Sequence, residues 1–128
     1  MNPVFLELED ILEIHQDQIE RYGGRAGVRD IGLLESALAV PQAGAMGQFF
    51  HADVFEMAAA YLYHIVRNHP FIDGNKRTAA MAAFTFLSLN GRSLKAPDRD
   101  FEEIVQAAAV GKTDKRAIAQ FFRKHARG

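Results

Sequence analysis

The sequence lacks cysteine, long apolar runs and an excess of charge of one sign. None of its 128 residues is a cysteine, which excludes disulfides and thiolate metal sites or nucleophiles. No apolar run approaches the ~18 residues needed to span a bilayer, and "MNPVFLELED" lacks the basic-then-apolar pattern of an export signal. We therefore expect a cytoplasmic protein with no membrane contact. Because the formal net charge is only -1, we expect no direct nucleic-acid binding, and any phosphate site must be local.

What remains is the composition of an ordinary globular protein. Hydrophobic residues make up 48% of the chain and charged residues 24%, which is enough apolar surface to form a core. A chain of this length forms about one domain without disulfides or metals. We expect residues 1–128 to fold as a single domain.

The spacing of apolar residues predicts helices. Intervals of three and four recur in six stretches, at about residues 5–22, 30–40, 53–68, 75–89, 98–110 and 113–126. Candidate N-caps are Asp30, Asp53, Asp98 or Asp100, and Thr113 or Asp114. No stretch alternates as a strand should, so the fold class is all-α, a compact bundle of about six helices. Residues 75–89 are apolar on almost every side and are expected to form its buried central helix.

Two segments interrupt the helical pattern. "YGGRAGVRD", residues 22–30, carries three glycines within five positions and predicts a loop, because glycine disfavours helix and adopts positive φ easily. Residues 41–50, "PQAGAMGQFF", have no helical period and carry two aromatic residues. We expect this second segment to be a mobile flap.

The stretch "HPFIDGNKR", residues 69–77, predicts at least a turn between two helices. Pro70 prevents helix continuation, Asp73-Gly74 is a turn pair, and Asn75 can cap the next helix. This interpretation gives no reason for the histidine or for the two cations that end the stretch.

A binding site explains those residues. The first amides of a helix lack partners and attract an anion, and Gly74 lets a ligand approach them. Lys76 and Arg77 place two cations at this positive helix end, which is unfavourable unless an anion is bound. Asp73 is a hard oxygen ligand suited to Mg²⁺, and His69 has a side chain suited to a general base near neutral pH. Together they indicate nucleotide-dependent group transfer to a hydroxyl.

The same stretch resembles the signature of the Fic/Doc superfamily, His-x-Phe-x-Asp/Glu-Gly/Ala-Asn-x-Arg. Upstream "YGGRAGVRDIGLLESALAVPQ" and downstream "RTAAMAAFTFLSLNG" are similar to the Doc branch, the death-on-curing toxins of toxin–antitoxin pairs. The resemblance covers about residues 5 to 125 and implies the Fic/Doc fold.

The resemblance also implies an activity. The larger Fic branch has glycine between Asn and Arg and transfers AMP from ATP to protein hydroxyls. Here Lys76 stands at that position, as in the Doc branch, which transfers the γ-phosphate of ATP to a threonine of elongation factor Tu and inhibits translation. Gly74 is also compatible with the AMP-transferring pattern, because the best-known Doc toxin has alanine there. AMP transfer is therefore the alternative, and a non-catalytic corepressor that binds an antitoxin is a second one.

Carried over by position, the resemblance assigns roles to the motif. His69 would be the catalytic base and Asp73 the Mg²⁺-linked carboxylate, while Phe71 would anchor the loop in the core. The phosphates of ATP would be held by Gly74, Asn75, Lys76 and Arg77.

Other residues carry weaker signals. No Ser/Thr-x-x-x-Glu-Gly/Asn motif, which silences some Fic proteins from within, occurs in the chain, so restraint is expected from a Phd-like antitoxin whose disordered end folds as a helix on the toxin. His15, His51, His64 and His125 do not have metal-ligand spacing. Arg67 is expected either to reach a phosphate or to favour a helix C-terminus.

Overall fold

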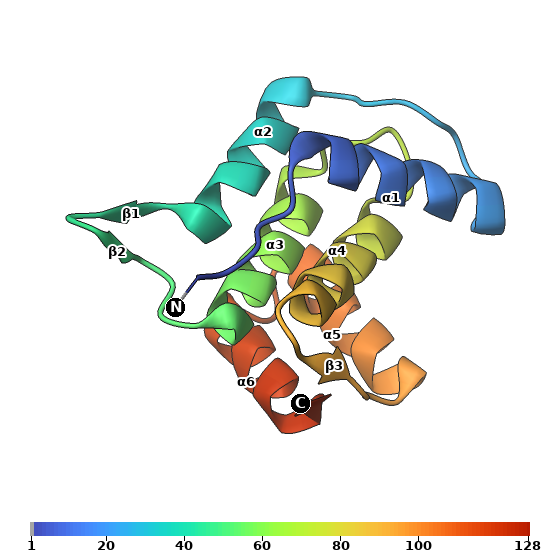
Figure 1. Ribbon diagram of the computed structural model, residues 1–128. Coiled ribbons are helices and arrows are strands. Elements are labelled where there is room, and N and C mark those ends of the chain that lie inside the picture. Colours follow the sequence, from blue (N-terminus) through green and yellow to red (C-terminus); the bar gives the residue numbers. More distant parts are fainter. Residues whose placement is uncertain (1) are drawn as a thin grey trace.

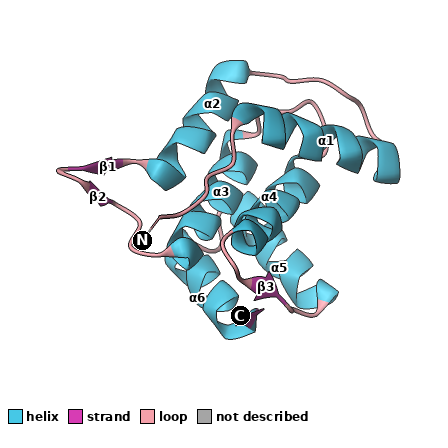
Figure 2. Cartoon of the chain, viewed as in Figure 1, coloured by secondary structure: helices cyan, strands magenta, loops and turns pink. Residues whose placement is uncertain are grey.

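The structure, a computed structural model, describes residues 2–128 and is built from six α-helices (Figures 1 and 2). The α-helices are α1 (Leu8–Tyr22), α2 (Ile31–Ala39), α3 (Val54–Asn68), α4 (Asn75–Leu89), α5 (Asp98–Ala109) and α6 (Lys115–His125). A short 3-10 helix, η1 (Val40–Gln42), follows α2. The strands are β1 (Gly44–Ala45), β2 (Gln48–Phe49), β3 (Ser93–Leu94) and β4 (Ala126–Arg127). The all-α prediction of about six helices is confirmed.

Four strands escaped the sequence analysis because each has only two residues, too few to show alternation. They form two antiparallel pairs, β1 with β2 and β3 with β4. The first pair is the segment expected to be a flap. Its turn residues Met46 and Gly47 both have positive φ, 53° and 77°, as a tight two-residue hairpin requires. The hairpin projects away from the helices, with Met46 fully exposed at its tip (Figure 1).

Aspartate caps begin three of the helices, as predicted. The carboxylates of Asp30, Asp53 and Asp114 each accept a hydrogen bond from the backbone N–H three residues later, at 2.9–3.0 Å. The predicted cap of α5 is wrong. Pro97 occupies the N-cap position and Asp98 is already the first helical residue, because proline fixes a φ that suits a helix start.

The core lies around α3 and α4. Helix α3 packs on α2, α4, α5 and α6, and α4 also packs on α1 and α5 (Figure 1). Six alanines of the two helices are fully buried, Ala58, Ala59, Ala60, Ala79, Ala82 and Ala83. Small side chains allow the two helix backbones to approach closely, with Tyr61 and Phe86 filling the remaining space. Helix α4 is buried as expected, except along an edge that exposes Met81 and Phe84.

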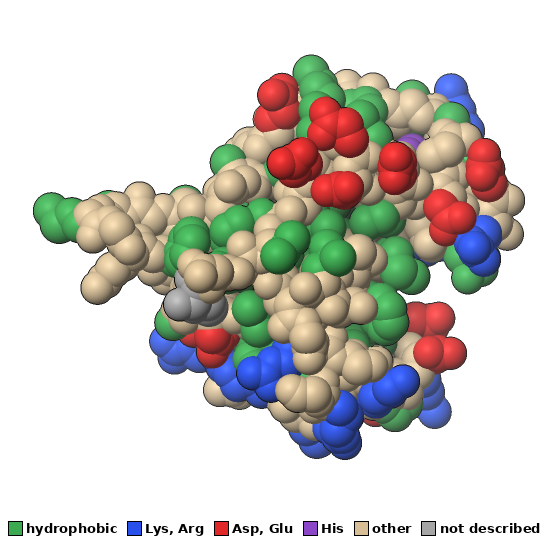
Figure 3. All heavy atoms as spheres, viewed as in Figure 1, with side chains coloured by type: hydrophobic (Ala, Val, Ile, Leu, Met, Phe, Trp, Pro, Cys, Tyr) green, Lys and Arg blue, Asp and Glu red, His purple; other side chains and the backbone are tan. Residues whose placement is uncertain are grey.

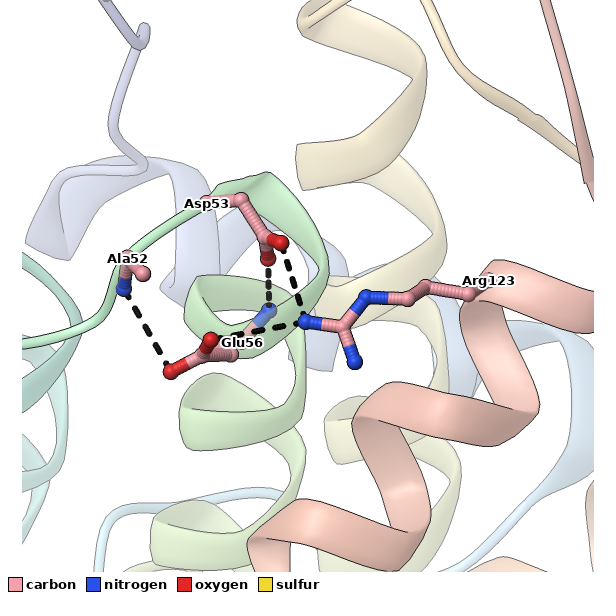
Figure 4. Close-up of polar contacts among 4 residues, drawn as sticks. All are labelled: Ala52, Asp53, Glu56 and Arg123. Carbon is pink, nitrogen blue, oxygen red and sulfur yellow. Dashed lines mark hydrogen bonds and ion pairs between the residues drawn. The ribbon is translucent and has the colours of Figure 1, made fainter.

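A surface ion-pair network joins α6 to the start of α3 (Figure 4). Arg123 Nη2 lies 2.9 Å from Asp53 Oδ2 and 3.4 Å from Glu56 Oε2. Burial alone would raise the pKa of Asp53, but the Glu56 backbone N–H and the Arg123 guanidinium together hold that pKa below its usual value. Asp53 therefore both caps α3 and ties it to α6.

Charge is unevenly distributed over the surface. Acidic side chains gather where α1 and α2 lie, and basic side chains gather on the opposite side, where α6 and the C-terminus lie (Figure 3). Five of the fifteen residues of α1 are acidic. In residues 2–128, no helix is both long and apolar enough to cross a membrane.

Candidate active site

The motif residues 69–77 form the turn between α3 and α4. Helix α3 ends at His69, which adopts the left-handed conformation with φ 52° and ψ 54°. Its backbone N–H still donates to the Ile65 carbonyl, at 3.1 Å, and Pro70 then prevents another helical turn. The His69 side chain is exposed and makes no hydrogen bond to residues 2–128. It is therefore free to meet a substrate.

Asn75 shapes the turn from inside. Its side chain is 5% exposed, and its amide accepts from the Phe71 N–H at 2.9 Å and donates to the Phe71 carbonyl at 3.0 Å. The cap of α4 is consequently Gly74, with φ 77°, and the prediction of Asn75 as cap is wrong. Both polar ends of the Asn75 amide are therefore occupied by backbone. A contact between Asn75 and phosphate stays a prediction.

Phe71 anchors the turn in the core, as predicted. It is fully buried, and its ring stacks on that of His15 at 3.9 Å between centroids and 7° between planes. His15 Nε2 donates to the carbonyl of Asp73 at 2.8 Å. This buried histidine of α1 thus holds the middle of the turn at Phe71 and Asp73. Its place on the inward face of α1 is compatible with this role but does not predict it.

The glycine-rich loop 23–30 runs antiparallel beside the motif and pairs with it along its length. Ile72 N–H donates to Gly27 O at 3.1 Å, Arg29 N–H donates to Pro70 O at 2.7 Å, and Val28 forms a β-bridge with Phe71. At the far end, Arg77 Nη2 donates to Gly23 O at 2.9 Å. Sequence reasoning identified a loop here but missed that this loop is the scaffold of the site.

Glycine permits the close approach of the two segments. A Cβ on Gly24, whose φ is +113°, would lie 2.7 Å from Asp73 Oδ2, and one on Gly27 would lie 2.9 Å from Ile72 Cδ1. Both distances are shorter than real side chains allow. A side chain at either position would displace Asp73 or Ile72 and would also have to adopt a positive φ.

Asp73 is held in its charged form. Its Oδ2 accepts from the Arg25 N–H at 3.2 Å and its Oδ1 from the Gly74 N–H at 2.9 Å. These two bonds, with a smaller contribution from the charge of Arg77, lower the pKa of Asp73 below its usual value. An exposed carboxylate fixed in this way can offer its remaining lone pairs to a cation.

The start of α4 is open to an anion. The N-cap Gly74 offers no side chain, and the amides of residues 75–77 donate no hydrogen bond to residues 2–128. Helix α5 also lacks a side-chain cap, but its first turn carries two acids, Asp98 and Asp100. The first turn of α4 carries no acid. Asp73, just before the helix, offsets part of the positive end of the helix dipole, and the amides of residues 75–77 stay open.

Lys76 and Arg77 have no acidic partner within residues 2–128. Lys76 Nζ donates to Gln106 Oε1 of α5 at 3.0 Å, and the Arg77 guanidinium lies 5.6 Å from the ring centroid of Tyr22. Both cations line a groove of about 660 Å³ between α1, α4 and α5, whose apolar wall includes Met81. Neither cation forms an ion pair with the described residues, and the Asp73 carboxylate, which interacts with the charge of Arg77, offsets only part of the positive charge of this turn.

The structure brings three of the six predicted site residues together. Asp73, Gly74 and Arg77 meet around the open start of α4, and His69 lies at the opposite end of the same turn. The Lys76 side chain departs from this cluster and runs to α5. One of the two predictions for Arg67 was that it favours a helix C-terminus. It does bind one, but that of α5, because its Nη1 donates to the Ala109 carbonyl at 3.1 Å.

The donor set around Asp73 fits Mg²⁺ better than zinc. No group of three or more His, Cys, Asp or Glu side chains within residues 2–128 could hold a metal by itself. Mg²⁺ commonly uses one or two carboxylates and takes its other ligands from water and phosphate oxygens. A single fixed carboxylate beside an open anion site therefore suits a metal that arrives with a nucleotide.

Comparison with known proteins shows the family of this chain. The family model described as Fic/DOC family matches residues 5–87. Toxin Doc of Mycolicibacterium smegmatis (strain ATCC 700084 / mc(2)155) is 41% identical over 118 residues, which cover 90% of this chain and 88% of that protein. Protein kinase doc of Escherichia phage P1 is 33% identical over 117 residues, 91% of this chain and 90% of that protein. The chain belongs to the Fic/DOC family.

Proposed function

We propose that this protein is a Doc-type toxin that moves the γ-phosphate of ATP to a threonine hydroxyl of a translation factor, with elongation factor Tu as the first candidate. The observation that supports this best is the open start of α4, where, among the described residues, three amides donate no hydrogen bond and the nearby Arg77 side chain forms no ion pair. A nucleotide phosphate fits these amides and this cation. The names of the two relatives, a toxin and a protein kinase, agree with the proposal.

In the proposed reaction, the imidazole of His69 takes the proton of the target hydroxyl. The hydroxyl oxygen then attacks the γ-phosphorus, the bond to the β–γ bridging oxygen breaks, and ADP leaves. The amides of residues 75–77 and the Arg77 guanidinium stabilise the charge that develops on the phosphate oxygens. Asp73 would hold Mg²⁺, which neutralises part of the phosphate charge when it is bound.

Lys76 favours phosphate transfer over AMP transfer. A glycine at this position would leave bare backbone for an inner phosphate, whereas lysine brings a stem and a mobile positive charge. Lys76 Nζ now bonds a neutral glutamine, so no ion pair has to break for it to turn toward a nucleotide. Gly74 is compatible with either reaction, and AMP transfer remains the second candidate.

ATP labelled on one phosphate at a time decides between the reactions. Purified protein is incubated with elongation factor Tu and Mg²⁺, once with γ-labelled and once with α-labelled ATP. The proposal expects label on the target from the γ position alone. Label from the α position alone would establish AMP transfer instead, and label from neither would leave the non-catalytic corepressor for this target.

A neighbouring antitoxin is the proposed partner, acting in the cytoplasm where translation takes place. The groove beside Arg77 exposes Tyr22, Met81 and Phe84, an apolar strip next to the two cations of α4, while its α5 wall carries the acids Asp98 and Glu102. An amphipathic helix with an acidic side fits such a groove and would cover the phosphate-binding cations. Phe84→Asp should weaken antitoxin binding measured by calorimetry, with Val110→Asp, an exposed apolar residue outside the groove, as the matched control.

A further inference from the structure

Arg29 clamps the end of α3 from the glycine-rich loop. Its Nε donates to the carbonyl of His69 at 2.8 Å, and its Nη2 donates to the carbonyl of Asn68 at 3.0 Å. Its backbone N–H donates to the carbonyl of Pro70 at 2.7 Å. One residue therefore holds three consecutive carbonyls, with that of His69 in the middle.

This clamp acts where the backbone needs support. The left-handed conformation of His69 is strained for a residue with a Cβ, which approaches the following carbonyl oxygen. The last carbonyls of a helix have no partners within the helix and favour a nearby cation. The planar fork of a guanidinium can serve two carbonyls at once, whereas an ammonium group is a single point charge. Arg29 thus supplies at one place what this helix end lacks.

The direction of the His69 side chain depends on this backbone. The imidazole is exposed and makes no hydrogen bond of its own to residues 2–128, so its starting direction is set by the backbone that carries it. The guanidinium of Arg29 is already engaged with carbonyl oxygens. Two of its nitrogens are thereby committed to backbone and Arg29 does not line the groove, whereas Arg77 donates a single bond, to Gly23 O, and does line it.

We propose that Arg29 is a positioning residue, which aims His69 at the target hydroxyl by fixing the left-handed turn, an inference that rests on the proposed role of His69 as base. Arg29 itself touches neither nucleotide nor target. Its loss should therefore slow the chemical step and leave the affinity for ATP almost unchanged.

Arg67 provides a matched control. It lies in the last turn of the same helix, is exposed like Arg29, and also donates a guanidinium hydrogen bond to a backbone carbonyl. That carbonyl belongs to Ala109 on α5, not to the turn at His69. Arg67→Gln removes one charge and one such bond from this helix end without releasing His69.

Steady-state kinetics with ATP and the target protein test the proposal. Arg29→Gln should lower kcat roughly tenfold or more and change KM for ATP by less than about twofold, because a misplaced base slows chemistry and not binding. Arg29→Lys should restore part of kcat, since one ammonium reaches one carbonyl, and Arg67→Gln should match the wild type. Equal kcat values for Arg29→Gln and the wild type would overturn the proposal, as would a loss of the same size in Arg67→Gln.

A second measurement does not require activity. In ¹⁵N-labelled protein, the amide and ring signals of His69 should shift or broaden in Arg29→Gln, and should stay in place in Arg67→Gln. Unchanged His69 signals in Arg29→Gln would overturn the positioning role. If the wild type transfers no label to any target, the proposed function fails on its own, and these signals still decide whether Arg29 fixes the turn.

Discussion

At Gly24 the loop backbone passes so close to Asp73 that one added methyl group has no room. The neighbouring Gly23 also has positive φ, +82°, but a Cβ there would meet nothing within 4 Å. Substitutions at the two glycines can therefore distinguish the effect of backbone strain alone from the effect of displacing the Asp73 carboxylate.

Gly24→Ala and Gly23→Ala should both lose roughly 1–3 kcal/mol of stability, because each forces alanine into a strained conformation. Only Gly24→Ala should also push Asp73 away from its position, and it should lower the transfer rate roughly tenfold or more. Thermal unfolding and label transfer measure the two effects. Equal transfer rates in the two variants would show that the close approach of Gly24 does not matter for the site.

At the scale of one element, the start of α4 shows what sequence reasoning can and cannot give. The helix was predicted at about residues 75–89 and spans Asn75–Leu89, because the turn pair and the apolar run mark its two ends. The role of Asn75 was predicted wrongly, because an asparagine beside a helix start is equally suited to cap the helix or to bind the preceding loop. Only the packed structure shows that its amide turns back to Phe71.

Asn75→Ala should destabilise the protein by roughly 2–4 kcal/mol, since it removes two hydrogen bonds and leaves a buried N–H and carbonyl of Phe71 unpaired. Thr78 offers a matched control one turn later. Its hydroxyl is buried and has no hydrogen-bond partner within residues 2–128, so Thr78→Val should leave stability unchanged or raise it slightly. Denaturant unfolding measures both variants. A larger loss in Thr78→Val than in Asn75→Ala would contradict the role given to Asn75.

At the scale of the whole molecule, packing partly buries ionisable groups outside the motif, His64 on α3 and His51 before it. Burial, followed by the charge of Lys115 on α6 and the proximity of His51, lowers the pKa of His64 from 6.5 to about 4. Burial and Lys115 also lower the pKa of His51, while Glu56 opposes this shift. Both imidazoles are therefore neutral in the folded protein at neutral pH.

Stability should consequently fall on mild acidification. Between pH 6.5 and 4 the unfolded chain binds a proton at His64 that the folded protein does not. Above pH 6.5 His64 therefore costs no stability, and below it the free energy of unfolding falls as the pH falls. Because His64 is only part-buried, we expect a loss of roughly 1–2 kcal/mol between pH 7 and 5. His64→Gln should show a clearly smaller loss in denaturant unfolding. The same loss in both proteins would contradict this source of pH dependence.

The fold as a whole was easier to predict than the site. Apolar periodicity and aspartate caps depend on neighbours in sequence, so the six helices followed from local patterns. The pairing of residues 23–30 with the motif joins segments about 45 residues apart, and no local pattern encodes it. Arg29 and His15 belong to the site only through that pairing and through packing of α1 against the turn. The motif residues themselves were found because their chemistry is concentrated in nine positions.

The most direct test of the account is the intact mass of elongation factor Tu after incubation with this protein, ATP and Mg²⁺. His69→Asn is the matched variant, because asparagine tolerates the left-handed conformation that His69 adopts and is no general base. With the wild type, the mass of elongation factor Tu should rise by one phosphate group, and with His69→Asn it should not change. A gain equal to one AMP, or the same phosphate gain with His69→Asn, would contradict the account.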